Sequence, residues 1–181
     1  HRTTVSFTTE QYQPQIRYTL DGSTPGGQSI LYTGPFAVNG SASVAAAIFK
    51  DSLPQGKTAF LQIDDHLAIG KKVIYNIPYS KKDPAQQAAT LVNGYRGTPT
   101  YKDGQWQGYD KDMDVTIDMG KATPLKSLSV NFMQLTGPGV YIPAFVEVLV
   151  SDDGKNFRKI KQLENDVPTT TATLTFKDFK F

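Results

Sequence analysis

Few residues in this chain have the type and spacing that catalysis requires. The three glutamates are Glu10, Glu147 and Glu164, and Glu147 stands between two valines, a pattern typical of an outward-facing strand residue. The adjacent acids Asp64-Asp65 and Asp152-Asp153 lie in segments of turn composition. Two histidines and no cysteine supply neither a nucleophile–base pair nor a zinc ligand set. We therefore expect no catalytic centre in this chain.

The segment YRGTPTYKDGQWQGY, residues 95–109, favours a different chemistry. Carbohydrate sites on β-sandwiches combine an aromatic ring, which covers the apolar face of a pyranose, with planar polar groups for its hydroxyls. Residues of both kinds occur together in this Gly-rich segment, and the tryptophan is the only one in the chain. The candidate binding residues are Arg96, Tyr101, Asp103, Trp106 and Tyr109. The first three of these lie in loop-like sequence, where ligand contact is favoured.

Composition excludes several other classes of function. The chain has 181 residues and a net charge of +2, with 19 basic and 17 acidic residues and no basic stripe, so we expect no nucleic-acid partner. Its longest apolar run, from Val44 to Phe49, is far shorter than the roughly 20 residues of a membrane-spanning helix, so no transmembrane segment is expected. The absence of cysteine excludes disulfides and leaves the compartment open.

The elements that would position these residues are strands. Thr, Val, Tyr and Phe are frequent, Gly and Pro punctuate the chain, and the only short helical pattern is PAQQAATLV at residues 84–92. We predict an all-β fold made of two β-sandwiches. In the first unit, strands are predicted at residues 4–8, 15–20, 43–49 and 57–63.

The stretch IRYTLDGSTP, residues 16–25, predicts a hairpin. Ile16, Tyr18 and Leu20 alternate with polar residues, and Asp21-Gly22 has the composition of a tight primed turn that requires positive φ. Such a turn does not explain the Ser-Thr-Pro that follows it, nor YTGPF at residues 32–36.

The second unit contains three clear alternations, at residues 113–119, 128–132 and 146–150. SDDGKNF, residues 151–157, then predicts a hairpin turn with Asp153-Gly154 at its tip. The final stretch TATLTFKDFKF still alternates apolar and polar residues at Phe181. An unpaired apolar edge invites aggregation, so we expect the natural protein to continue beyond this residue.

The strings IRYTLDGSTP, YTGPF and VAAAIF together resemble the small immunoglobulin-like sandwich that follows the catalytic domain in bacterial chitobiases and β-hexosaminidases. The resemblance implies that residues 1–63 form such a domain. In that family the YTLDGSTP string is a structural signature without a catalytic role. The hexosaminidase active site belongs to a separate (β/α)₈ barrel, with an adjacent Asp-Glu pair that this chain lacks.

Residues 64–181 resemble a discoidin-like (coagulation factor type C) domain, a galactose-binding-like jelly roll, here truncated at its C-terminus. The strings LVNGYRGTPTYKDGQWQGY, DMDVTIDMGK and VEVLVSDDGKNF carry this resemblance. The order of the two domains resembles the C-terminal region of β-N-acetylhexosaminidases of the Bacteroidetes type. It implies a periplasmic, cell-surface or secreted location.

The second resemblance adds expectations about the site. Discoidin-like domains commonly keep a Trp that packs the end of the sandwich, so packing and ligand contact both remain open for Trp106 and Tyr109. Related domains place an aromatic residue in the loop MQLTGPGVYIP, which here offers Tyr141. They also often bind one Ca²⁺ near LVDG. In this chain Asn93 stands where Asp is common, and Thr98 with nearby carbonyls would complete the site.

Two functional hypotheses follow from these observations. In the first, the chain is a non-catalytic accessory region of a glycoside hydrolase, and the second domain binds galactose-, GalNAc- or GlcNAc-type glycans weakly for a catalytic domain in cis. In the second, both domains are spacers or packing and dimerisation elements without a sugar site. Exposure of Trp106 beside Tyr101 favours the first, and burial of Trp106 under Phe132 or Phe145 favours the second.

Overall fold

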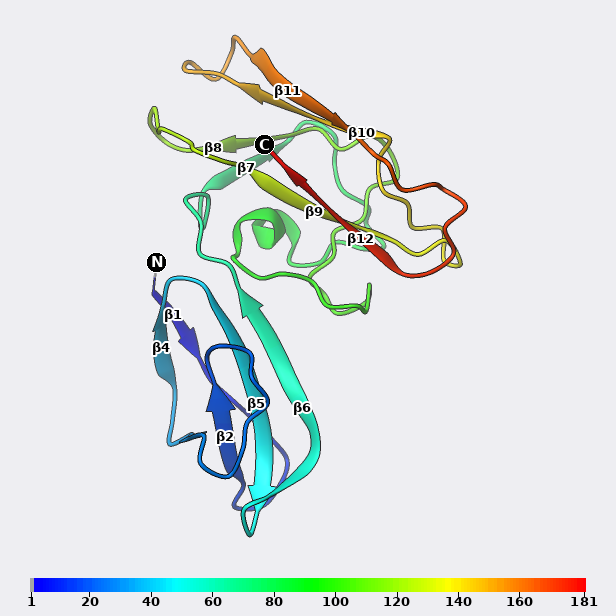
Figure 1. Ribbon diagram of the computed structural model, residues 1–181. Helices are drawn as coiled ribbons and strands as arrows, with labels where there is room; N and C mark the ends of the chain where they lie inside the picture. The colour runs from blue at the N-terminus through cyan, green and yellow to red at the C-terminus, as the bar shows by residue number, and fades with distance from the viewer. Residues whose placement is uncertain (1) are drawn as a thin grey trace. The chain divides into compact units, whose positions relative to one another are not determined.

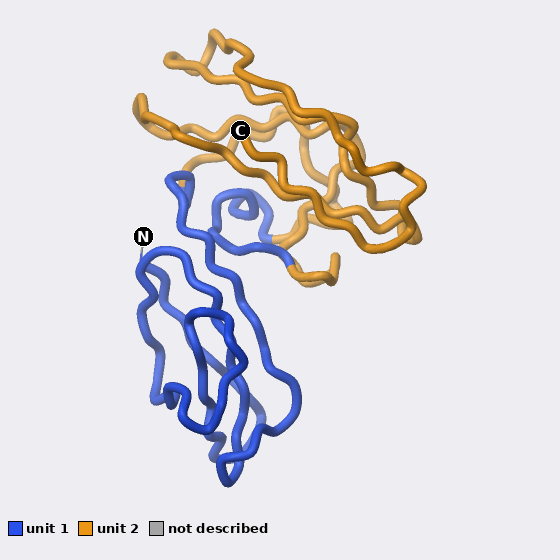
Figure 2. The backbone as a smooth tube through the Cα atoms, viewed as in Figure 1, with its two compact units in different colours: residues 1–70, 86–97 blue, residues 71–85, 98–181 orange. Residues whose placement is uncertain are grey.

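The computed structural model describes residues 2–181 as strands joined by long loops (Figure 1). The all-β prediction is confirmed. Contacts divide the chain into two compact units, one with the residues up to Gly70 and residues 86–97, the other with residues 71–85 and 98–181 (Figure 2). These units are defined by contacts and not by family, so the domain limits of 1–63 and 64–181 stay a prediction.

The first unit contains an antiparallel sheet of four strands in the order β3-β2-β5-β6 and a separate antiparallel ladder of β1 with β4 (Figure 1). The predicted strands at 15–20, 43–49 and 57–63 correspond to β2, β5 and β6, and the one at 4–8 overlaps β1. The strands are β1 (Arg2–Val5), β2 (Gln15–Thr19), β3 (Ile30–Leu31), β4 (Phe36–Asn39), β5 (Ala42–Lys50) and β6 (Leu53–Ile63). The predicted helical pattern at 84–92 is the 3₁₀ helix η1 (Gln87–Val92).

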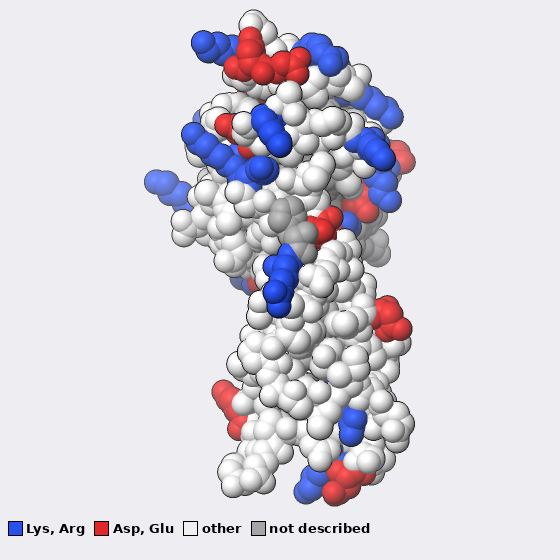
Figure 3. Space-filling view, turned by 90° about the vertical axis from the view of Figure 1, so that its left-hand side faces the viewer, with Lys and Arg blue, Asp and Glu red and all other residues white. Residues whose placement is uncertain are grey.

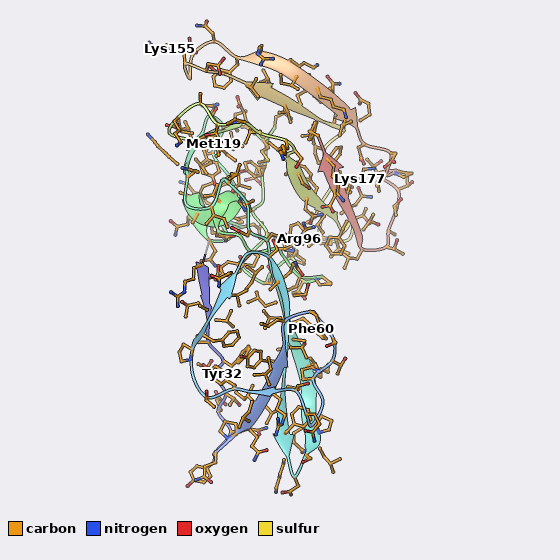
Figure 4. All side chains as sticks on the ribbon, turned by 60° about the vertical axis from the view of Figure 1, so that its left-hand side comes forward. Tyr32, Phe60, Arg96, Met119, Lys155 and Lys177 are labelled. Carbon is orange, nitrogen blue, oxygen red and sulfur yellow. The ribbon has the colours of Figure 1, made fainter. Side chains whose placement is uncertain are left out.

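Aromatic rings occupy the core of the first unit and explain the string YTGPF. The rings of Tyr18 and Phe36 stack with their centroids 4.3 Å apart, and Phe7 meets Tyr32 edge-on at 4.9 Å. The backbone N–H of Phe7 donates a hydrogen bond to the Tyr32 hydroxyl oxygen at 3.2 Å (Figure 4). Because edge-on and offset ring pairs add to the energy of area burial, these aromatics fix the distance between the two sets of strands.

The connection between β2 and β3 differs from the prediction. The prediction of a tight primed turn at Asp21-Gly22 is wrong, because Tyr18 pairs with Ile30 and the connecting loop spans residues 20–29. The positive φ of Gly22 is nevertheless present, at 82°. The Asp21 carboxylate accepts hydrogen bonds from the backbone N–H and the hydroxyl of Ser23 at 3.0 and 2.6 Å, which makes an Asx turn in place of the hairpin turn.

This loop runs along β5 and accounts for the Ser-Thr-Pro string. Gly22 approaches Ser43, since a Cβ on Gly22 would lie 3.0 Å from the Ser43 Cβ, and a Cβ on Gly27 would lie 3.4 Å from the carbonyl oxygen of Ser52. Pro25 is buried between these two points. The loop therefore follows β5 from one end to the other, in agreement with the burial of consecutive β5 residues on both of its faces, 44–47.

The second unit consists of three antiparallel two-stranded ladders, β7 with β8, β9 with β12, and β10 with β11 (Figure 1). The predicted alternations at 113–119, 128–132 and 146–150 correspond to β8, β9 and β10. The strands are β7 (Lys72–Tyr75), β8 (Val115–Asp118), β9 (Ser129–Gln134), β10 (Phe145–Val150), β11 (Arg158–Glu164) and β12 (Thr175–Lys180).

The hairpin turn predicted at residues 151–157 joins β10 to β11 and is confirmed. The Asp153 carboxylate accepts hydrogen bonds from the backbone N–H groups of Asn156 and Lys155, both at 2.8 Å, and from the Ser151 hydroxyl. These bonds, the one from the Asn156 backbone foremost, hold the pKa of Asp153 well below its usual range. The turn is thus closed by its own side chain.

The final strand, β12, lies against β9 throughout its length. Phe179 is buried and meets Phe132 edge-on at 5.7 Å, while Ala172, Leu174 and Phe176 are exposed. The buried polar residue of this region is Gln134, whose side-chain amide Nε2 donates hydrogen bonds to the carbonyl oxygens of Pro168 and Thr171. Gln134 therefore ties the loop before β12 to β9.

We expect Gly22→Ala to destabilise the first unit more than Gly40→Ala. Both glycines have positive φ, which costs an alanine roughly 1–2 kcal/mol. A Cβ on Gly22 would lie 3.0 Å from the Ser43 Cβ, whereas a Cβ on Gly40 would have no neighbour within 4 Å. Urea unfolding followed by near-ultraviolet circular dichroism of the tyrosines measures both variants. Equal losses of stability would contradict the close approach of the loop to β5.

Candidate functional site

The predicted site residues are distributed over both compact units. Asn93 and Arg96 belong to the first unit, within the segment that follows η1. The remaining predicted residues belong to the second unit, and each unit is described separately. They are Thr98, Tyr101, Asp103, Trp106, Tyr109 and Tyr141.

Arg96 lies in an ion pair at the end of the first unit (Figure 4). Its Nε donates to the Asp64 carboxylate at 2.8 Å, and the Asp64 backbone N–H donates to the carbonyl oxygen of Gly94 at 2.8 Å. Gly94 has φ +78°, and a Cβ there would lie 3.0 Å from the Ile69 side chain, so a glycine is required for this approach. Arg96 thus holds two chain segments together, and its predicted sugar contact stays a prediction.

The oxygens named for calcium already have N–H partners. The Asn93 side-chain oxygen accepts the backbone N–H of Tyr95 at 2.8 Å, and the Thr98 carbonyl oxygen accepts the Trp106 indole N–H at 2.8 Å. Ca²⁺ requires six to eight oxygen ligands. No group of three or more His, Cys, Asp or Glu side chains able to hold a metal ion occurs within residues 2–181. Backbone carbonyl oxygens can also bind Ca²⁺ and lie outside that group of side chains, so the calcium prediction stays a prediction.

Residues 98–106 form a loop closed by Asp103. Its carboxylate accepts the backbone N–H of Thr98 at 2.5 Å and that of Gln105 at 2.7 Å, and its own N–H donates to the Thr100 carbonyl oxygen at 3.0 Å. Hydrogen bonds to an ionised acceptor are among the strong ones in proteins. Asp103 therefore shapes the loop that presents its neighbours.

Trp106 is fixed at two points. Its indole N–H donates to Thr98, as described above, and its ring stacks on Phe176 with the centroids 5.7 Å apart and the planes 24° apart. The indole is half-buried, and Phe176 is 41% exposed. The stacking partner is thus neither Phe132 nor Phe145. Tyr101 is also half-buried, and the Lys102 ammonium lies 5.5 Å from the centre of its ring.

Phe176 is the residue that sequence reasoning missed. The alternation of the last segment identified it as an apolar strand residue, but 70 sequence positions separate it from Trp106. Only the pairing of β12 with β9 and the course of the 98–106 loop bring the two rings together. The local sequence contained no signal for this contact.

Tyr109 belongs to a cluster of tyrosines. Its hydroxyl donates to the Gln107 side-chain oxygen at 2.9 Å, and Tyr75 meets Tyr79 edge-on at 4.9 Å. Burial raises the pKa of the Tyr109 phenol far above its usual value, with smaller contributions from Tyr75 and Tyr79. Burial raises the pKa of Tyr75 as well. This environment favours neutral, packed phenols, so packing is the role that the geometry supports for Tyr109.

Tyr141 lies on the loop between β9 and β10 and is 53% exposed. The loop is closed by two backbone hydrogen bonds between Leu135 and Val140, both at 3.0 Å, which leave Tyr141 directly after the turn. A role for Tyr141 in sugar binding stays a prediction.

Charged side chains of both signs are interspersed on the face of the second unit that Figure 3 shows, and the first unit presents mostly uncharged atoms there. No field of one sign is therefore present on this face of the second unit. Among residues 2–181, no helix has the length and apolar character needed to cross a membrane.

We expect Asp103→Ala to increase the solvent accessibility of Trp106. Without the carboxylate, the backbone N–H groups of Thr98 and Gln105 lose their acceptor, at a cost of about 1 kcal/mol, and the carbonyl that holds the indole is released. Because Trp106 is the only tryptophan, acrylamide quenching of the intrinsic fluorescence reports on it directly. Asp152→Ala, at a distant exposed turn, is the control. Quenching unchanged in Asp103→Ala would exclude this role.

Stability should fall at alkaline pH because of the tyrosine cluster. The folded state raises the pKa of Tyr109, so its stabilising contribution is complete below about pH 10, where the phenol of the unfolded chain begins to ionise, and is lost as the pH rises further. We expect Tyr109→Phe to flatten the decline in unfolding free energy above this pH, measured by urea denaturation at a series of pH values. A decline of undiminished slope in the variant would contradict this assignment.

The comparison with known proteins identifies one part of the chain. The complete chain has no match among curated proteins. The matching family model is that of the Chitobiase/beta-hexosaminidase C-terminal domain, over residues 1–59. This range covers β1 to β5 and most of β6, the elements built around the aromatic core and the 20–29 loop. Residues 1–59 are therefore similar to the C-terminal domain of chitobiases and β-hexosaminidases.

Proposed function

We propose that this chain is a non-catalytic accessory region of a secreted or surface-located bacterial glycoside hydrolase of the β-N-acetylhexosaminidase type, such as those of Bacteroidetes. The first unit acts as a spacer next to the catalytic domain. The second unit, a discoidin-like jelly roll, binds terminal galactose, GalNAc or GlcNAc residues weakly. The match of residues 1–59 to the hexosaminidase C-terminal domain is the observation that carries the proposal.

The mechanism is an increase in effective concentration. A module that holds a glycan raises the local substrate concentration for a catalytic domain on the same chain, even when its own affinity is low. The spacer must let both domains reach the same glycan, because a geometry that prevents simultaneous engagement removes the gain. The first unit suits this role, since β5 is buried on both faces and its aromatic core joins both sets of strands.

Glycan binding by the second unit is supported by the properties of Trp106. The indole is partly accessible, and its hydrogen bond to the Thr98 carbonyl oxygen fixes its orientation. Tyr101 lies on the same loop, which the Asp103 carboxylate shapes. A fixed aromatic ring with an accessible face stacks on a pyranose at a small entropic cost.

The competing function is structural. Exposed apolar residues on β6, among them Leu53 and Phe60, favour packing of the first unit against another protein surface (Figure 4). In that case the chain stabilises the parent enzyme and binds no sugar. The two functions differ in one observable, the binding of glycans by the isolated chain.

A glycan array probed with the 181-residue chain tests the proposal, once with Ca²⁺ and once with a chelator. We expect binding to galactose-, GalNAc- or GlcNAc-terminated glycans and its loss in the Tyr101→Ala/Trp106→Ala variant, with folding verified by circular dichroism. Tyr12→Ala, at an exposed tyrosine of the first unit, is the matched control and should bind normally. An array that stays silent with the folded chain would refute glycan binding and leave the structural function.

A further inference from the structure

We propose that the sugar lies over the outer face of the β9–β12 ladder, where the Trp106 indole, backed by the ring of Phe176, forms the platform and Asn131 and Asp178 supply hydrogen-bonding groups. The ligand class is a neutral pyranose. This inference rests on the proposed function, and it names residues on strands where the sequence pointed to loops.

The register of the ladder defines the face. Phe176 pairs with Met133, and Asp178 pairs with Asn131. Residues directly opposite each other in an antiparallel ladder point to the same side, as do residues two apart along one strand. These four side chains therefore share one face of the ladder. Phe132 and Phe179 occupy the opposite face, where their rings meet.

Burial shows which of the two faces points outward. Phe179 is 1% exposed and Phe176 is 41% exposed, although both belong to the same short strand. Ser129 and Lys180, which pair at the end of the same face as Phe176, are also exposed. Met133 lies on this outer face and is nevertheless buried. Phe176, the cross-strand partner of Met133, carries the Trp106 ring stacked on it.

Polar groups suited to hydroxyl recognition stand beside the rings. The Asn131 side-chain N–H donates to the Asp178 carboxylate at 2.7 Å, so the two planar groups are held side by side. They lie two strand positions from the Phe176–Met133 pair, about 7 Å along the strand. A pyranose hydroxyl lies roughly 3 Å from the ring centre, and a hydrogen bond adds ~2.8 Å, so together they span most of this separation. One sugar can therefore contact the platform and the polar pair together.

The size and charge of this surface select the occupant. One face of the indole matches the area of one sugar, whereas a stable protein partner would bury about 800 Å² on each side. Asp178 and Lys180 on this face carry opposite charges, so the face has no net charge that would select a charged sugar. The indole is already fixed by its hydrogen bond to Thr98, so little side-chain entropy is lost on binding. A neutral pyranose satisfies all three conditions.

The experiment uses the single tryptophan as its probe. The 181-residue chain is titrated with methyl β-galactopyranoside and with methyl β-N-acetylglucosaminide while the Trp106 emission is recorded. We expect a saturable change in emission and protection from acrylamide quenching. Phe176→Ala and Asp178→Ala should each weaken binding about tenfold. Phe157→Ala is the matched control, because Phe157 is similarly exposed but belongs to the β10–β11 hairpin.

Phe176→Leu keeps the site apolar and tests the ring itself if the alanine variant fails to fold. Glycan binding on the array without any change in Trp106 emission, or with full affinity in Phe176→Leu, overturns this inference and leaves the proposed function intact. A silent array from the folded chain overturns both. Loss of binding in Phe157→Ala equal to that in Phe176→Ala would also overturn it, because binding would then not depend specifically on the outer face of the β9–β12 ladder.

Discussion

The hydrogen bond from the Trp106 indole to the Thr98 carbonyl oxygen is the constraint on which the candidate site depends. It joins the end of the 98–106 loop to its beginning, and Asp103 closes the same loop through two backbone N–H groups. With both ends fixed, the indole has one orientation, and that orientation places it on Phe176. A loop without these bonds would allow the ring to turn, and no defined aromatic surface would exist.

In the first unit, small residues and one loop produce a comparable rigidity. β5 carries three consecutive buried alanines, and the 20–29 loop approaches the start of this strand at Gly22 and the turn after its end, Ser52, at Gly27. Inside, the stack of Tyr18 on Phe36 joins the four-stranded sheet to the β1–β4 ladder. Both faces of the central strand are therefore covered within a unit that has few strands.

Local alternation of apolar and polar residues was sufficient to predict β2, β8 and β10, whereas β5 was predicted from an apolar run that is buried on both faces. The hairpin at 151–157 was predictable because its turn is closed by its own residues. The 20–29 loop was not, since its path is set by contacts with β5 and not by Asp21-Gly22 alone. Trp106 was found by residue type, while Phe176 and Asn131 became apparent only through the register of β9 with β12.

The hydrogen bonds of the predicted polar residues explain why polar groups on the strands are needed for sugar binding. Arg96 joins Asp64, and both oxygens of Asp103 face backbone N–H groups, so the loop residues chosen for their hydrogen-bonding chemistry mainly maintain the chain's own conformation. A sugar stacked on Trp106 would still require planar polar partners. On the outer face beside Phe176, the Asn131–Asp178 pair provides them at a position fixed by strand pairing. In this arrangement the 98–106 loop supplies the Trp106 ring and the hydrogen bonds that hold it. The β9–β12 ladder supplies the Phe176 ring behind it and the polar side chains of Asn131 and Asp178.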